Sequence, residues 1–254
     1  MTNSAKVVIS FLFAAMLTGC IGEIKCEDYK ALTALDRDHD GKTDYRFHFI
    51  GDSILAYNNL SCQSVGHGVG FEIDEQVLPK AVIGAKVHEI QEQFVEPKNS
   101  ETDYDYVIVN GGLNDLIASE KVGDPEAVPC DCNGMLNHDA CLQEIEDVTQ
   151  RMRSLIDSIQ EKSDAHITLV GYYPAEKRKS FIGQCFPYVD LMNASYQEMA
   201  DLDEYVSFIQ TYGNDQPTVN KVSQYGYDNY HPTPKGSNIM AHLIIEHFEL
   251  EIAE

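Results

Sequence analysis

Basic residues are scarce in this chain, which has 18 Lys and Arg against 41 Asp and Glu in 254 residues and a formal net charge of −23. A surface of this sign repels nucleic acid and anionic lipid headgroups. The composition therefore argues against a nucleic-acid partner and against a phosphodiester substrate held in a basic groove. For the acidity itself, a role in solubility is the simplest interpretation.

The sequence also lacks internal repeats, low-complexity blocks and any apolar run long enough to span a bilayer. Its apolar run at residues 7–17 follows Lys6 and ends in Leu17-Thr18-Gly19-Cys20. A basic start, a short apolar core and small residues before a cleavage point are typical of a secretory signal. The Leu-x-Gly-Cys ending resembles the bacterial lipobox, in which the Cys becomes the diacylated first residue of the mature protein.

This resemblance implies that residues 1–19 are removed and that Cys20 carries a lipid anchor. Because Ile21, not Asp, follows Cys20, we expect the bacterial outer membrane as the location, with the protein facing the periplasm or the exterior. An ordinary signal peptide with a chance Cys is the alternative. We predict a tether and lead-in at residues 20–44, and the length of residues 45–254 fits one domain with a full core.

Strand and helix patterns alternate along the predicted domain. Such alternation predicts a parallel sheet with helices on both faces, an α/β fold with three layers and about five strands, similar to flavodoxin. The pattern at residues 142–160 places one apolar stripe toward the sheet. The predicted strands are residues 46–50, 77–83, 106–110, 167–172 and 205–209, and the predicted helices are residues 87–94, 142–160, 189–202 and 236–250.

Six cysteines remain besides Cys20, and an even number in an exported chain suggests disulfides. Cys26 and Cys62 flank the first predicted strand, so we expect them to pair. The remaining four would hold the long insertions together, although the sequence cannot fix their pairing. A zinc site at Cys130-x-Cys132 fits poorly, because the spacing is tight and the compartment is oxidising. These four cysteines are Cys130, Cys132, Cys141 and Cys185.

An acidic segment lies just before the first predicted strand. Asp36, Asp38 and Asp40 alternate and are followed by Gly41, and this arrangement resembles the first part of an EF-hand calcium loop. Lys42, through its backbone carbonyl, and Asp44 would complete the predicted ligands of a structural calcium ion. The position of the usual final Glu holds Phe47, so the loop is not a standard EF-hand, and a solvated acidic turn is the alternative.

Four short motifs occur in order along the chain: Gly51-Asp52-Ser53-Ile54, Gly84, Gly112-Leu113-Asn114-Asp115 and Asp228-Asn229-Tyr230-His231. The first three each follow a predicted strand, and the carboxyl ends of parallel strands are where such sheets bind ligands. In this order the motifs resemble those of the SGNH/GDSL hydrolase family, whose namesake residues are Ser, Gly, Asn and His. Gly84 is the weakest match, because three other glycines also lie between the first and third motifs. They are Gly66, Gly68 and Gly70.

The resemblance implies an ester hydrolase that needs no catalytic cofactor. Ser53 would be the nucleophile, His231 its base and Asp228 the acid that orients His231. The Ser53 and Gly84 backbone N–H groups and the Asn114 amide would bind the oxyanion. Asp52 and Asp115 are expected to support these loops. The chain lacks the Gly-x-Ser-x-Gly turn of α/β-hydrolases.

The substrate is not fixed by these residues. An acidic, exported and lipid-anchored hydrolase suits short acyl groups on glycans, and a lipase, lysophospholipase or thioesterase is the alternative within enzymes. A non-catalytic, calcium-dependent module that binds the envelope is an alternative of another class, and the intact motifs argue against it. The oligomeric state is not predicted.

Overall fold

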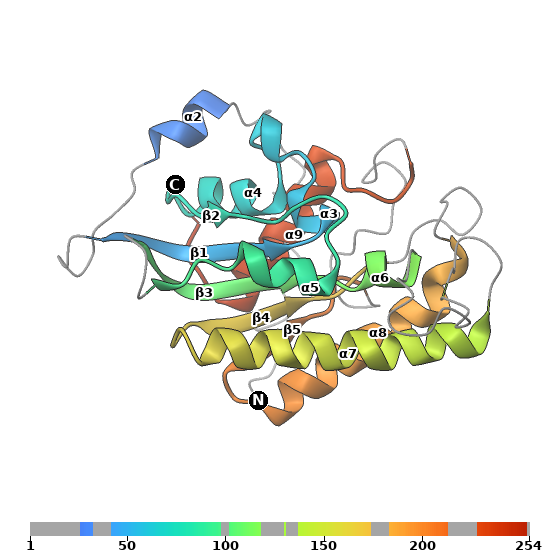
Figure 1. The fold of residues 1–254 in the computed structure, drawn as a ribbon. Coiled ribbons are helices and arrows are strands. Elements are labelled where there is room, and N and C mark those ends of the chain that lie inside the picture. Colours follow the sequence, from blue (N-terminus) through green and yellow to red (C-terminus); the bar gives the residue numbers. More distant parts are fainter. Residues whose placement is uncertain are drawn as a thin grey trace, which may run out of the picture.

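Five parallel strands form the centre of the molecule (Figure 1). The structure is a computed structural model that describes residues 26–32, 42–97, 102–117, 130, 137–173, 183–212 and 228–252. The strand order is β2-β1-β3-β4-β5, which is the flavodoxin-like order. The strands are β1 (Thr43–Gly51), β2 (Leu78–Pro79), β3 (Thr102–Asn110), β4 (His166–Val170) and β5 (Val206–Ile209).

Helices cover both faces of this sheet, so the predicted three-layer α/β/α fold is confirmed. In Figure 1, α2, α3, α4 and α9 lie on one face, and α5, α7 and α8 lie on the other. The stripe predicted on α7 is buried at Ile145, Val148, Met152, Leu155, Ile156 and Ile159. The helices are α2 (Cys26–Ala31), α3 (Ser53–Ala56), α4 (Val65–Glu72), α5 (Val87–Ile90), α6 (Leu113–Ile117), α7 (His138–Gln160), α8 (Phe186–Leu202) and α9 (Pro234–His247), with short 3₁₀ turns η1 (Asn59–Ser61), η2 (Gln91–Gln93) and η4 (Gly183–Cys185).

The second strand is much shorter than the predicted residues 77–83. Pro79 has no N–H to donate, which restricts it to the edge of a sheet. Beyond it, the Lys80 and Val82 N–H groups donate singly to Phe49 O and Gly51 O, at 2.8 and 2.9 Å. The chain therefore follows β1 without a continuous ladder.

The helical pattern predicted at residues 87–94 was wrong in its extent and is divided into α5 and η2. The sequence also gave no sign of α4, because glycine is a poor helix former. Three glycines recur at alternate positions of α4, and at one of them, Gly68, a β-carbon would lie 3.0 Å from Ala241 Cβ on α9. These glycines allow two helices to pack closely on the sheet.

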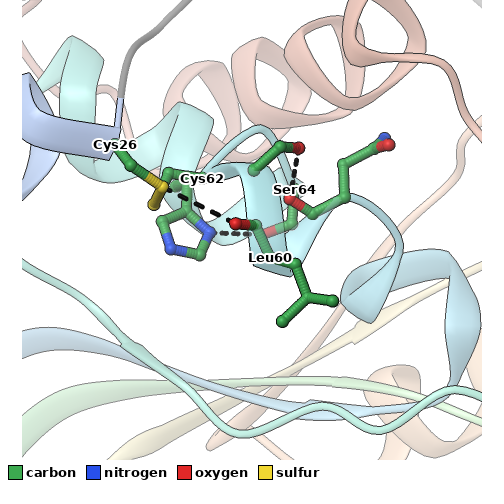
Figure 2. Close-up of a disulfide and its surroundings, with 7 residues drawn as sticks. Cys26, Leu60, Cys62 and Ser64 are labelled. Carbon is green, nitrogen blue, oxygen red and sulfur yellow. Dashed lines mark hydrogen bonds between the residues drawn. A yellow bond between two sulfur atoms is a disulfide. The ribbon is translucent and has the colours of Figure 1, made fainter.

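The expected disulfide between Cys26 and Cys62 is present (Figure 2). It joins α2 to the start of the α4 region, and Tyr29 of α2 is buried in the core. Part of the predicted tether therefore belongs to the folded domain. A second disulfide joins Cys130 to Cys141, and Cys185 is disulfide-bonded as well.

Several predicted features lie outside the described residues: the signal at residues 1–19, Cys20, Asp36, Asp38, Asp40 and Cys132. Lys42 and Asp44 are described, and Lys42 Nζ lies 3.8 Å from Asp103 Oδ2. Over the described ranges, no group of three or more His, Cys, Asp or Glu is arranged to hold a metal ion. None of the helices in those ranges is long and apolar enough to cross a bilayer.

Candidate active site

A tight turn at the end of β1 presents Ser53. Gly51 has φ +146°, and a β-carbon there would lie 2.3 Å from Asn110 O on β3, so only glycine fits. Asp52 then caps α3, because its Oδ1 accepts a hydrogen bond from Ile54 N–H at 2.9 Å. Ser53 is the first residue of α3 and is 5% exposed. Asp52 is therefore the N-cap residue of α3, and the Ser53 hydroxyl is not needed to cap this helix.

His231 comes from a loop just before α9. Asp228 Oδ1 accepts hydrogen bonds from the Tyr230 and His231 N–H groups, both at 3.0 Å. Its Oδ2 contacts His231 Nδ1. One carboxylate therefore fixes both the backbone of this loop and the orientation of its imidazole ring.

The structure brings Ser53 and His231 together across 178 residues of sequence, with Ser53 Oγ 2.8 Å from His231 Nε2. The Tyr57 ring lies flat on the imidazole, with ring centroids 4.7 Å apart and planes 7° apart. Asn58 Nδ2 donates to Pro232 O at 3.1 Å. The segment after α3 thus holds the histidine loop against the serine, and the chain Ser53–His231–Asp228 has the geometry of a nucleophile, a base and an orienting acid.

The two carboxylates of the site have opposite pKa shifts. Burial would raise the pKa of Asp228, but hydrogen bonds from the His231 ring and from two backbone N–H groups lower it below its usual value. Asp228 is therefore ionised at neutral pH. Burial raises the pKa of Asp52 to about 6, against hydrogen bonds from Tyr172 and Ile54 that lower it. Asp52 is 1% exposed and does not touch His231 Nδ1, which fits a supporting role.

Asn114 lies in the first turn of α6, on the same side of the sheet edge. Its Nδ2 donates to Ala85 O at 3.0 Å and lies 3.5 Å from Asp52 Oδ2. Asp115 accepts from Val87 N–H and from Arg151 Nη2, both at 3.1 Å. Asp115 therefore joins the Asn114 turn to α5 and α7, as expected for a supporting residue.

Gly84 lies in the loop after β2, next to Ala85 and so next to the Asn114 amide. Its φ is +81°, and a β-carbon there would meet nothing within 4 Å. Among the described residues, neither the Ser53 N–H nor the Gly84 N–H donates to a protein acceptor. Gly66 and Gly68, in contrast, lie within α4, where they serve packing. Gly84, unlike them, lies in a loop beside the Asn114 turn and leaves its backbone N–H available there.

Three side chains around the site were not predicted. Tyr57 lies four residues after Ser53, a helical spacing that could have indicated its proximity. Tyr172 follows β4, so it comes from the sheet edge where reacting groups were expected, and its hydroxyl donates to Asp52 Oδ2 at 2.5 Å. Gln93 binds both the N–H and the carbonyl of Gly51, and no sequence signal distinguishes it from a surface glutamine.

The surface beside the Gly84 loop carries exposed apolar side chains. Val82 is 53% exposed and Ile83 60%. Both line a hollow of about 500 Å³ that also includes Gly84 and Ala85. Leu60 is fully exposed on the neighbouring loop, which Asn59 Nδ2 joins to Ala81 O at 3.4 Å. Gly84 lines this hollow, and Ser53 and His231 do not. The hollow therefore lies beside the Gly84 loop and does not include the Ser53–His231 pair.

Comparison with known proteins identifies this arrangement. The sequence profile of the GDSL-like lipase/acylhydrolase family matches residues 49–239, a span that contains all four motifs. The chain belongs to this family. As a GDSL hydrolase it acts on ester bonds, and the family needs no catalytic cofactor. No curated protein matches the chain at a significant level.

Solved structures of lipolytic proteins share this fold. A GDSL-like lipase from Bacteroides thetaiotaomicron is 19% identical, with a TM-score of 0.56 over 88% of this chain and 94% of the other. A lipolytic G-D-S-L protein from Veillonella parvula is 14% identical, with a TM-score of 0.56 over 82% and 99%. A lipase from a goat rumen metagenome is 16% identical, with a TM-score of 0.55 over 80% and 96%. At such identities the likeness shows the fold alone.

Proposed function

We propose that this GDSL hydrolase cleaves carboxylic esters through an acyl-Ser53 intermediate and removes short acyl groups from glycans of the cell envelope. The observation that carries the catalytic part is the distance of 2.8 Å between Ser53 Oγ and His231 Nε2, with Asp228 on the other nitrogen of the ring. The glycan part is supported by the predicted export and by the acidic composition, which disfavours anionic substrates.

In the first half-reaction, Ser53 Oγ attacks the ester carbonyl carbon while its proton moves to His231 Nε2. Ionised Asp228 stabilises the imidazolium that forms. The tetrahedral intermediate collapses when the bond from carbon to the alcohol oxygen breaks, and the departing alcohol takes the proton from His231. Water then attacks the acyl-serine in the same way and releases the acid and free Ser53.

The oxyanion would be bound by the Ser53 and Gly84 N–H groups and by one hydrogen of the Asn114 amide. The bond from Asn114 Nδ2 to Ala85 O at 3.0 Å fixes the amide through its other hydrogen. The distance of 3.5 Å to Asp52 is at the limit of a hydrogen bond, so the remaining hydrogen is only weakly occupied and can serve the oxyanion.

A second candidate substrate is an ester with a longer acyl chain, as in a lipase, lysophospholipase or thioesterase. The exposed Leu60, Val82 and Ile83 support it, because apolar side chains beside an acyl-enzyme would gain from covering an alkyl chain. Nitrophenyl esters of increasing acyl length separate the two candidates. A maximum of kcat/KM at acetyl, with release of acetate from an acetylated glycan, supports the first, and a maximum at long chains supports the second.

The catalytic assignment is tested with Ser53→Ala and a matched control, Ser61→Ala. Ser61 is exposed, and its hydroxyl donates only to Asn58 O nearby at 3.0 Å. We expect Ser53→Ala to lose ester hydrolysis by several orders of magnitude and to escape labelling by a fluorophosphonate, while Ser61→Ala keeps both. Full turnover by purified Ser53→Ala protein would refute the assignment.

The location remains a separate proposal, supported by the sequence Leu17-Thr18-Gly19-Cys20. Lipid on Cys20 would keep the domain within reach of envelope substrates. Expressed in a bacterial host, the wild type is expected in the membrane fraction with added lipid mass on Cys20, and Cys20→Ala in a soluble or unprocessed form. An intact mass that lacks lipid, or that retains residues 1–19, would contradict it.

A further inference from the structure

One buried hydroxyl connects the two loops that carry Ser53 and Asn114. Tyr172 Oη donates to Asp52 Oδ2 at 2.5 Å and accepts from Leu113 N–H at 3.2 Å. Asp52 immediately precedes Ser53, and Leu113 immediately precedes Asn114. A single oxygen atom therefore contacts the residue before the proposed nucleophile and the residue before the proposed oxyanion donor.

The position of Tyr172 is itself fixed by the protein. It lies two residues beyond the end of β4, where strand pairing has ended. Asn193 of α8 takes the place of a neighbouring strand, because its Oδ1 accepts from Tyr172 N–H at 3.0 Å and its Nδ2 donates to Tyr172 O at 2.9 Å. The side chain of Tyr172 is fully buried, so its hydroxyl is a rigid reference point.

Removal of this hydroxyl would affect both loops at once. Asp52 Oδ2 would keep only the distant Asn114 amide, at 3.5 Å, and would attract it more strongly. The Leu113 N–H would lose its acceptor. The first change draws the Asn114 amide toward Asp52 and away from an oxyanion on Ser53, and the second loosens the turn that holds Asn114. Small displacements of catalytic groups cost large factors in rate.

We propose that Tyr172 is a positioning residue that sets the separation of the Asn114 amide from Ser53 through hydrogen bonds to Asp52 and Leu113. The proposal rests on the proposed function of Ser53 and Asn114. Tyr172 would then affect the rate of the reaction although it touches neither the substrate nor the reacting atoms.

The test compares Tyr172→Phe with Tyr104→Phe in hydrolysis of nitrophenyl acetate. Tyr104 is a matched control, since it is also buried on the sheet and its hydroxyl donates to a backbone carbonyl, Val95 O. We expect Tyr172→Phe to lower kcat by roughly 10- to 100-fold with KM changed less than about twofold, because the loss falls on the transition state. Tyr104→Phe is expected to lower the melting temperature and to keep kcat.

A second variant, Asp52→Asn, tests the same hydrogen bond from its other side. The amide keeps an oxygen for Ile54 N–H but presents an NH₂ group to Tyr172. Asp52→Asn should itself lower kcat, and if Tyr172 acts through Asp52, adding Tyr172→Phe to Asp52→Asn should lower kcat by less than Tyr172→Phe does in the wild type, so the effects should not multiply. This variant also keeps the proposal testable if Tyr172→Phe folds poorly.

The pH dependence of kcat distinguishes a positioning role from a loss of packing, because a packing defect alone would not shift it. The groups that face Asp52 are Tyr172, His231, Asp115 and Tyr196, and the Tyr172 hydrogen bond is one of the contacts that lower the pKa of Asp52. In Tyr172→Phe, Asp52 should be protonated at higher pH, so the limb of the kcat profile that follows Asp52 should move upward in pH. In Tyr104→Phe the limb should stay in place.

The outcomes separate the two proposals. If the wild type is inactive, or Ser53→Ala is as active as the wild type, the proposed function fails. If hydrolysis depends on Ser53 and yet Tyr172→Phe keeps kcat within twofold of Tyr104→Phe, the positioning role alone is refuted. A rise in KM without a fall in kcat, or effects of Tyr172→Phe and Asp52→Asn that multiply, would refute it as well.

Discussion

A substitution of Gln93 gives the clearest prediction about how the site contributes to the free energy of unfolding. Its Oε1 accepts from Gly51 N–H at 2.7 Å, and its Nε2 donates to Gly51 O at 3.0 Å. Strand β2 ends at Pro79, so Gln93 supplies at Gly51 the partner that a longer strand would have supplied. The substitution Gln93→Leu keeps the approximate size of the side chain and removes both hydrogen bonds.

The expected magnitude follows from what each backbone group retains. Gly51 O keeps its bond from Val82 N–H at 2.9 Å, so the carbonyl stays satisfied. The Gly51 N–H loses its partner in a buried place, and an unsatisfied buried donor costs about 1–3 kcal/mol. We therefore expect Gln93→Leu to lower the free energy of unfolding by about 2 kcal/mol, which corresponds to roughly 4–8 °C in Tm for a chain of this size.

Urea unfolding followed by far-UV circular dichroism, with the disulfides intact, measures this loss. Gln91→Leu is the matched control, because Gln91 Nε2 donates to Ser158 Oγ at an exposed position, 3.2 Å away. Exposed substitutions of this kind usually change stability by less than about 0.5 kcal/mol. If Gln93→Leu and Gln91→Leu unfold at the same urea concentration, the reasoning about Gly51 is wrong.

Three further predictions concern the site, the core and the acidic segment. Asn114→Ala should lower kcat by roughly 100-fold with little change in KM, and a change in KM alone would show that Asn114 binds substrate instead. Burial lowers the pKa of His48 from 6.5 to about 4, so the stability that neutral His48 supports is present above pH 6.5 and is lost as the pH falls toward 4. Relative to His48→Asn, the wild type should lose up to roughly 3 kcal/mol over this range in urea unfolding, and parallel pH curves would contradict it. If residues 36–44 bind calcium, a chelator should lower Tm and added calcium restore it, whereas identical melting curves would leave the acidic turn as the interpretation.

The residues that sequence analysis identified are those that lie in short motifs. Ser53 and Asn114 follow predicted strands, and Asp228 and His231 are three residues apart, so each pattern is local. The meeting of Ser53 and Asn114 was expected because the carboxyl ends of parallel strands share one edge, and that of His231 with Ser53 was implied by the family resemblance. The register of β1 with β3, which pairs Gly51 with Asn110, provides that edge.

The residues that it missed act through contacts between distant parts of the chain. Tyr172 reaches Asp52 across 120 positions, and Gln93 reaches Gly51 across 42. Neither belongs to a motif, and their types are common in ordinary cores and surfaces. The helix α4 was missed for a related reason, since its glycines oppose helix formation locally and are compensated by close packing against β1, α2 and α9.

The supporting residues share one physical task, which explains why carboxamide side chains occur where strands end. A buried backbone needs partners for its N–H and C=O groups, and beyond the last ladder hydrogen bond no strand provides them. Gln93 binds Gly51, Asn193 binds Tyr172, and Asn110 Nδ2 donates to Val170 O at 2.8 Å. The first pair satisfies the backbone just before the turn that carries Ser53, and the other two satisfy the backbone at the end of β4, which leads to Tyr172. These backbone groups are therefore paired where the strands stop, and the turns gain a rigid base. Substitutions in this layer should cost stability wherever a backbone group loses its partner. They should cost catalysis only where the lost bond also separates Ser53 from Asn114, as at Tyr172.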